Sequence, residues 1–192
     1  MKPAHRTSLI FGGARSGKSA FAEQLASGFS ANKKEVLYLA TANADDAEMQ
    51  QRIAHHRARR PAHWRTLEQS LELGATIMAH SRADNIILVD CLTVWLSNLL
   101  FSEAADFPDV GHVTPPAQFA VQRQALLDAL AQAPGQIILV TNEVGMGIVP
   151  MGAVSRWFVD EAGRLNQAVA AIADTVVWVA AGLPLYFKGQ PC

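Results

Sequence analysis

Residues 8–19 read Ser-Leu-Ile-Phe-Gly-Gly-Ala-Arg-Ser-Gly-Lys-Ser, and they carry the most specific structural signal in the chain. A short strand-like run leads into Gly-x-x-x-x-Gly-Lys-Ser, and helix-forming residues follow. In such a unit the glycines let successive backbone N–H groups point at phosphate oxygens, and the helix start adds positive dipole charge. We expect Lys18 to reach the β- and γ-phosphates of a nucleotide and the Ser19 hydroxyl to ligate Mg²⁺. The expected phosphate-loop contacts are Gly12, Gly13, Ala14, Arg15, Ser16, Gly17, Lys18 and Ser19. The alternative interpretation is a glycine turn followed by a chance lysine.

Short apolar, β-branched runs alternate with longer helix-like stretches along the chain. Several runs are apolar at successive positions, as in parallel strands that are buried on both faces. The expected strands are residues 8–11, 36–40, 86–89, 137–140 and 176–180. The expected helices are residues 18–27, 45–59, 71–80, 93–101, 116–132 and 155–173. This alternation predicts an α/β fold, with a mostly parallel sheet and helices on both faces. The length of 192 residues fits one domain, residues 1–192.

The composition excludes several classes of protein. Half of the residues are apolar and 17% are charged, which excludes a natively unfolded chain. The formal net charge of -1 leaves no basic excess for a nucleic-acid partner. Two cysteines, Cys91 and Cys192, are too few for a disulfide framework and are typical of a reducing cytosol. Residues 168–187 are largely apolar, but Asp174 near their middle favours a helix followed by a buried strand over a membrane span. We expect a cytoplasmic protein without a signal peptide.

Asp90 ends the apolar run of residues 85–90, where the second metal-binding residue of a phosphate-loop enzyme belongs. The alternative is that Asp90 caps the helix that begins near Thr93. Residues 141–144 read Thr-Asn-Glu-Val, which does not match the Asn-Lys-x-Asp guanine reader of a regulatory GTPase. Among the classes of phosphate-loop protein considered, a kinase for a small molecule remains.

Residues 45–59 form an expected helix that opens with acidic residues and closes with basic ones. His55 shares its polar face with Arg52 and Arg59 at three- and four-residue spacing. The adjacent His55 and His56 diverge by about 100° on a helix, which is poor spacing for a metal site. An imidazole among guanidinium groups suits attack on an anionic phosphorus centre. The alternative is a solvated helix end rich in His and Arg.

Three segments together resemble a known family. Residues 12–19 resemble its first signature. Residues 40–41, the His55-His56 helix and residues 60–66 resemble its second. Residues 141–150 (Thr-Asn-Glu-Val-Gly-Met-Gly-Ile-Val-Pro) resemble its third. The family is the bifunctional adenosylcobinamide kinase and adenosylcobinamide-phosphate guanylyltransferase of cobalamin biosynthesis. The resemblance implies a RecA-like phosphate-loop fold and two reactions. ATP or GTP first phosphorylates adenosylcobinamide, and GTP then transfers GMP through an enzyme histidine to give adenosylcobinamide-GDP, with Mg²⁺ as cofactor.

Residue by residue, the resemblance implies that His55 is the guanylylated histidine. It further implies nucleotide contacts at Thr41, Ala42, Asn43, His56, Arg57, Ala58, Arg59, Glu68 and Asp90, and a homo-oligomer, a trimer in this family. Asp90 stands where enterobacterial members have glutamate. Two alternatives remain open: a single-function phosphate-loop kinase for another alcohol, and a nucleotide-binding switch without turnover.

The glycine-rich residues 144–150 follow an expected strand at the carboxyl edge of the sheet, where open α/β sheets bind ligands. We expect this loop to form a wall of the active site. The alternative is a structural crossover with close backbone packing.

Overall fold

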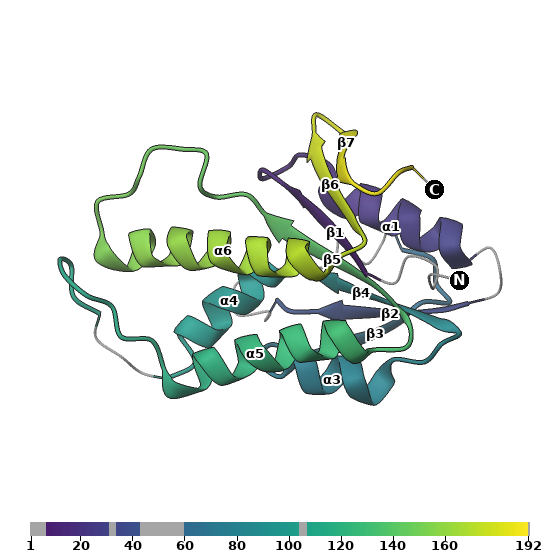
Figure 1. Cartoon of the computed structure of the whole chain (residues 1–192), viewed down its shortest axis with the longest axis horizontal. Coiled ribbons are helices and arrows are strands. Elements are labelled where there is room, and N and C mark those ends of the chain that lie inside the picture. The colour runs from purple at the N-terminus through teal and green to yellow at the C-terminus, as the bar shows by residue number, and fades with distance from the viewer. Residues whose placement is uncertain (1–6, 31–33, 43–59, 104–106, 192) are drawn as a thin grey trace.

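The computed structural model describes residues 7–30, 34–42, 60–103 and 107–191 (Figure 1). Within them the strands are β1 (Thr7–Gly12), β2 (Glu35–Ala40), β3 (Arg65–Glu68), β4 (Asn85–Asp90), β5 (Gln136–Asn142), β6 (Thr175–Ala180) and β7 (Leu183–Lys188). The helices are α1 (Lys18–Ser30), α3 (Leu73–His80), α4 (Leu92–Leu100), α5 (Ala117–Gln132) and α6 (Ala153–Ile172). The expected strands and the expected helices that fall in these ranges are all present, with ends that differ by a few residues. The expected helix of residues 45–59 lies outside the described residues.

The strands form one sheet in the order β3-β2-β4-β5-β1-β6-β7. Every neighbouring pair is parallel except β6 and β7. One strand, β5, separates the phosphate-loop strand β1 from β4, which ends in Asp90. This separation is the strand arrangement of RecA-like phosphate-loop proteins. Because the strands are parallel, their carboxyl ends meet at one edge of the sheet, and the candidate site lies there.

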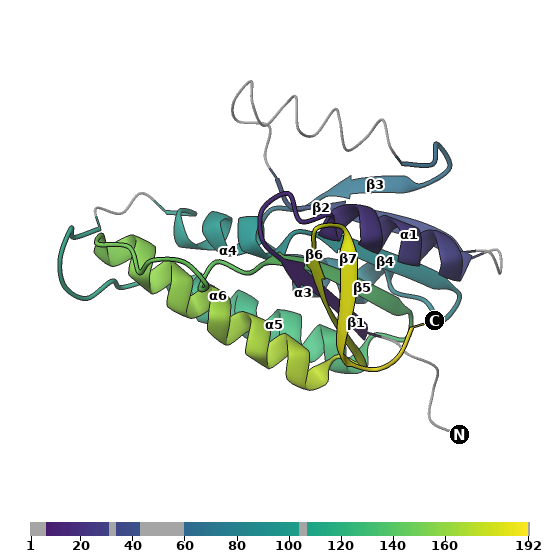
Figure 2. The same ribbon diagram turned by 90° about the horizontal axis from the view of Figure 1, so that it is seen from above.

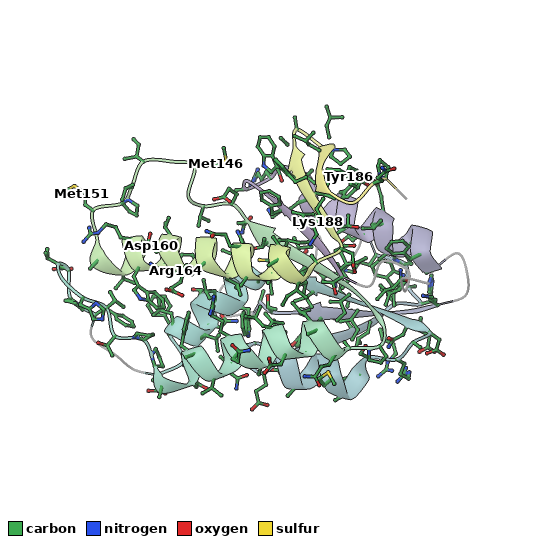
Figure 3. The ribbon with its side chains drawn as sticks, viewed as in Figure 1. Met146, Met151, Asp160, Arg164, Tyr186 and Lys188 are labelled. Carbon is green, nitrogen blue, oxygen red and sulfur yellow. The ribbon has the colours of Figure 1, made fainter. Side chains whose placement is uncertain are left out.

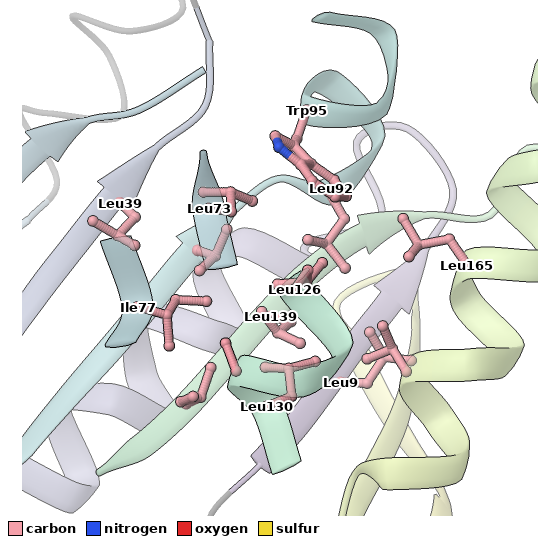
Figure 4. Close-up of a cluster of buried hydrophobic side chains, with 14 of the residues drawn as sticks. Leu9, Leu39, Leu73, Ile77, Leu92, Trp95, Leu126, Leu130, Leu139 and Leu165 are labelled. Carbon is pink, nitrogen blue, oxygen red and sulfur yellow. The ribbon is translucent and has the colours of Figure 1, made fainter. Parts of the chain in front are cut away.

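Helices cover both faces of the sheet, as expected (Figure 2). The larger core cluster packs one face against α3, α4, α5 and α6, and includes Leu39, Leu139 and Trp95 (Figure 4). The second cluster packs the other face against α1, and includes Tyr38, Val140 and Ala22. Burial on both faces explains why the central strands are apolar at successive positions.

Two strands, β3 and β7, are absent from the sequence expectations. Both are edge strands with mostly exposed residues, so they lack the continuous apolar pattern that identified the others. Pro184 in β7 also argued against a strand, although an edge strand tolerates proline. The turn before β7 consists of Ala181 and Gly182, both with positive φ (51° and 78°), which suits a tight hairpin. Alanine at such a position gives no recognisable hairpin signal.

Residues 168–187 are therefore divided among the end of α6, β6 and β7, a correction to the expected helix and single strand. No helix in the described ranges combines the length and the hydropathy that a membrane crossing requires.

Gly74 tests the packing of α3 on α5. A Cβ at this position would lie 2.5 Å from the backbone carbonyl carbon and oxygen of Ala125. We expect Gly74→Ala to lower the free energy of unfolding by about 1–3 kcal/mol, because the two helices must separate. Urea titration measures the change.

Gly163→Ala on α6 is the matched control, because its Cβ would meet no atom within 4 Å. This variant should gain about 0.5–1 kcal/mol from helix propensity. Equal stability of the two variants would contradict the proposed close contact.

Candidate functional site

The loop between β1 and α1 places Lys18 and Ser19 in the first turn of the helix. Arg15 and Gly17 have φ of 55° and 96°, and these left-handed residues curl the loop back towards α1. Lys18 is 8% exposed, and its Nζ donates to the Gly13 carbonyl at 3.1 Å. Ala14 and Arg15 are exposed, whereas Gly13, Ser16, Gly17 and Ser19 are half-buried. The backbone N–H groups of a first helical turn have no partners within the helix and can bind phosphate oxygens.

The turn between β6 and β7 packs directly on this loop. The Gly182 N–H donates to the Ser16 carbonyl at 2.8 Å. A Cβ on Gly17 would lie 3.0 Å from Gly182 Cα, and a Cβ on Gly12 would lie 2.3 Å from the Val179 carbonyl oxygen. Close packing therefore requires a glycine at both positions, and the positive φ of Gly17 is a second reason at that one.

The expected carboxylates lie in one row at the carboxyl edge. In the strand register, Ala40 is paired with Glu68 on one side and with Asp90 on the other. Neighbouring strands are about 4.8 Å apart, so the Cα atoms of Glu68 and Asp90 are about 10 Å apart. Register partners in a parallel sheet share a face, and this is the face that α1 covers.

Asp90 is held by a chain of side chains that crosses this face. The Tyr38 hydroxyl donates to Asp90 Oδ2 at 3.0 Å, and the Arg60 guanidinium lies 3.3 Å from the centre of the Tyr38 ring. Arg60 also forms an ion pair with Glu23 of α1 at 3.8 Å, and both side chains are buried. Burial of Tyr38 raises the pKa of its hydroxyl, and Asp90 raises it further. Tyr38 therefore stays protonated and remains a hydrogen-bond donor to the carboxylate.

Asp90 does not cap a helix. The residue that precedes α4 is Cys91, and no side chain makes a capping hydrogen bond there. Burial raises the pKa of the Cys91 thiol to about 11, and the charge of Asp90 raises it as well, whereas Lys18 lowers it. The thiol is therefore neutral near pH 7.

Thr41 joins β2 to the start of α4. Its hydroxyl donates to the Cys91 carbonyl at 2.9 Å and accepts from the Cys91 N–H at 2.8 Å. Asn98 donates to the Thr41 carbonyl at 2.7 Å. Thr41 is fully buried, and its hydrogen bonds to Cys91 hold the end of β2 against the start of α4. Ala42 is half-buried.

The remaining expected residues, Asn43, His55, His56, Arg57, Ala58 and Arg59, lie outside the described residues. Their described neighbours in the chain are Ala42, which follows β2, and Arg60, which stacks on Tyr38 beside Asp90.

The glycine-rich loop after β5 begins beside the phosphate loop, because the Glu143 N–H donates to the Gly12 carbonyl at 3.0 Å. Glu143 Oε1 accepts from the Gly145 N–H at 2.8 Å. The loop then extends over α6, with Met146 and Met151 well separated along it (Figure 3). Its exposed apolar side chains are Met146, Ile148, Val149 and Met151.

A sequence model of the family "cobinamide kinase / cobinamide phosphate guanyltransferase" matches residues 8–187. The chain belongs to this family. The bifunctional adenosylcobalamin biosynthesis protein CobP of Pseudomonas aeruginosa is 51% identical over 183 residues, which cover 95% of this chain and 98% of that protein. The CobU proteins of Escherichia coli and Salmonella typhimurium are each 43% identical, over 94% of this chain and 98% of their own lengths.

Solved structures with low sequence identity share the fold of this family member. The flagellar accessory protein FlaH of Methanocaldococcus jannaschii has a TM-score of 0.51 at 15% identity, over 97% of this chain and 80% of that chain. A second solved structure, an ATPase domain, also has a TM-score of 0.51, at 14% identity, over 91% of this chain and 69% of that chain. Together with the strand order, these likenesses confirm the RecA-like phosphate-loop fold.

The donor set fits Mg²⁺. In phosphate-loop enzymes the protein supplies one hydroxyl and one carboxylate, and phosphates and waters complete the octahedron. Ser19 at the start of α1 carries a hydroxyl of this kind and Asp90 at the end of β4 carries a carboxylate, and Tyr38 donates to one carboxylate oxygen of Asp90. The described residues contain no cluster of three or more His, Cys, Asp or Glu side chains that could hold a metal ion alone.

Sequence reasoning assigned no role to Tyr38, Glu23 or Gly182. Arg60 lay within a recognised signature but was not among the expected contacts. The signal for the Tyr38–Arg60–Glu23 chain is weak, because its members come from three separate segments and meet only in the folded sheet.

Tyr38→Phe tests whether the hydroxyl holds Asp90. The ring that stacks on Arg60 is kept, but Asp90 loses the side-chain hydrogen bond that Tyr38 donates. We expect the free energy of unfolding to fall by about 1.5–3 kcal/mol, as for a hydrogen bond to a charged group. Tyr38→Leu should lose more, because the cation–π contact also disappears. Wild-type stability of Tyr38→Phe in urea titration would contradict this role.

Proposed function

We propose that this protein phosphorylates adenosylcobinamide with ATP or GTP and then transfers GMP from GTP to the phosphorylated product, giving adenosylcobinamide-GDP. The observation that carries the proposal is that the phosphate loop after β1 and Asp90 at the end of β4 lie at the same carboxyl edge of the sheet, in a chain of this family. The printed names of the relatives support the assignment to adenosylcobalamin biosynthesis.

In the first step, we propose that the acceptor hydroxyl oxygen bonds to the γ-phosphorus as the bond to the bridging oxygen breaks. The nucleoside diphosphate leaves with the electron pair, and the hydroxyl proton passes to solvent. Lys18, the loop N–H groups and the start of α1 stabilise charge on the phosphate oxygens. Ser19 and Asp90 would hold Mg²⁺, which neutralises charge on the β- and γ-oxygens when bound.

In the second step, we propose that His55 is the nucleophile. Its imidazole nitrogen attacks the α-phosphorus of GTP and pyrophosphate leaves; an oxygen of cobinamide phosphate then attacks the same phosphorus, and the P–N bond breaks. A covalent intermediate divides one difficult transfer into two easier ones. The position of Arg60 supports this role, because Arg60 follows His55 closely in the chain and stacks on Tyr38, which donates to Asp90. We further propose nucleotide contacts at Ala42, Asn43, His56, Arg57, Ala58, Arg59 and Glu68.

The acceptor is a large substrate with apolar surface. We propose that residues 144–151 contact it. This loop starts at the phosphate loop and exposes four large apolar side chains. A trimeric assembly, which the family resemblance implies, and a cytoplasmic location, which the two cysteines favour, stay predictions. The exposed Leu183, Leu185 and Phe187 of edge strand β7 offer apolar surface for subunit contact.

Lys18→Ala tests the phosphate loop. We expect phosphorylation of adenosylcobinamide to fall by about 10²–10³-fold, because the transferred group loses a buried positive charge. Lys34→Ala is the matched control, since Lys34 bonds Gln136 at the amino end of β5, away from the loop. Transfer of ³²P from [γ-³²P]ATP measures the rate, and an undiminished rate in Lys18→Ala would refute the assignment.

Incubation with [α-³²P]GTP and Mg²⁺, without cobinamide, tests the histidine. We expect a covalent label that is labile in acid and stable in base, as for a phosphoramidate, and its loss in His55→Ala. His63→Ala, which removes another histidine of the chain, should keep the label. Absence of label from the wild type with phosphorylation retained would indicate a single-function kinase. Absence of both reactions would indicate a nucleotide-binding switch.

A further inference from the structure

Asn142 occupies a position between the phosphate loop and Asp90. It is the last residue of β5, the strand that separates β1 from β4. In the strand register it is paired with Gly12, and the residue two positions earlier, Val140, is paired with Asp90. The strand spacings place Asn142 Cα about 5 Å from Gly12 Cα and about 8 Å from Asp90 Cα.

The side chain of Asn142 projects on the same face as that of Asp90. Successive residues of a strand point to opposite faces. Ile138 and Val140 pack in the cluster beneath α1, so Asn142 belongs to that face. Thr141 points the other way and donates to Asn166 Oδ1 of α6 at 3.0 Å.

The backbone of Asn142 is firmly held, but its side-chain oxygen is not bonded. The Asn142 N–H donates to Thr93 Oγ1 at 2.7 Å, and its carbonyl accepts from Asn166 Nδ2 at 3.3 Å. Asn142 Oδ1 is buried and has no hydrogen-bond partner among the described residues. A buried polar atom without a partner costs about 1–3 kcal/mol, and a ligand that supplies the missing hydrogen bond would recover this free energy.

A second buried atom without a described partner lies close to Gly12. Ser16 Oγ has no hydrogen-bond partner in the described chain, and a Cβ on Gly12 would lie 2.8 Å from it. Two polar side chains that need partners therefore flank Gly12 at the phosphate-loop end of the sheet.

We propose that the Asn142 carboxamide contacts the reacting groups in the phosphorylation step, with Nδ2 donating to a γ-phosphate oxygen and Oδ1 accepting from the attacking hydroxyl. A neutral amide can donate and accept at once, and it adds no charge that repels phosphate. The bonds made and broken are those of the first step above, so this inference rests on the proposed function. Asn142 orients the two reacting groups and takes no proton.

Asn142→Ala and Asn142→Asp test the role. We expect kcat for phosphorylation to fall by about 10²-fold in Asn142→Ala, as for removal of one donor to a charged transition state. Asn142→Asp keeps the shape of the side chain, but its kcat should be lower still because the negative charge repels the phosphate. Calorimetry with guanosine 5′-(β,γ-imido)triphosphate and with GDP should show a loss of preference for the triphosphate, while GDP binds within about two-fold of wild type.

Asn166→Ala is the matched control, because it removes an amide that contacts the same strand end from the opposite face. It should lower the thermal midpoint and keep the preference for the triphosphate. The proposal would be overturned if Asn142→Ala kept the wild-type kcat and the wild-type preference for the triphosphate. It would also be overturned if this variant bound the triphosphate analogue and GDP with equally reduced affinity. Failure of the wild-type protein to phosphorylate adenosylcobinamide would refute the proposed function instead, and the binding preference would still test Asn142.

Discussion

The close contact between the phosphate loop and the β6–β7 turn is the constraint on which the site depends. Gly12 and Gly17 approach the backbone of Val179 and Gly182 so closely that a side chain on either would collide with backbone atoms. The loop is thereby fixed on the β6–β7 hairpin and on α1 at once. This double attachment holds Lys18 and the open N–H groups of α1 in position for a phosphate chain.

The second constraint is electrostatic and lies at the end of β4, two strands away from β1. Asp90 accepts a hydrogen bond from Tyr38, Tyr38 lies under Arg60, and Arg60 is paired with Glu23 of α1. The helix that begins at the phosphate-loop lysine is therefore tied to the carboxylate that faces it. Because Arg60 follows the segment that contains His55, the same chain of contacts links the proposed metal site to the region of the proposed nucleophile.

Much of this arrangement could be predicted from local sequence. The phosphate loop, Asp90 and the central strands carry patterns that depend only on neighbouring residues and on burial of both faces. Strands β3 and β7 could not be predicted, because edge strands need no continuous apolar run and the β7 hairpin turns at an alanine. Glu68 was expected near the nucleotide, and the register of β3 with β2 places it at the same edge as Asp90.

Local patterns in the chain specify the chemistry available to this protein: a phosphate-binding loop, a carboxylate after a buried strand, and a family signature with a histidine pair. The other groups that face this chemistry are specified by the packing of the folded chain. Tyr38, Arg60 and Asn142 reach it because β2 and β5 flank β4, and the order of strands arises from contacts between residues far apart in the chain. Such contacts leave no local pattern, since each partner is selected by the packing of the whole sheet.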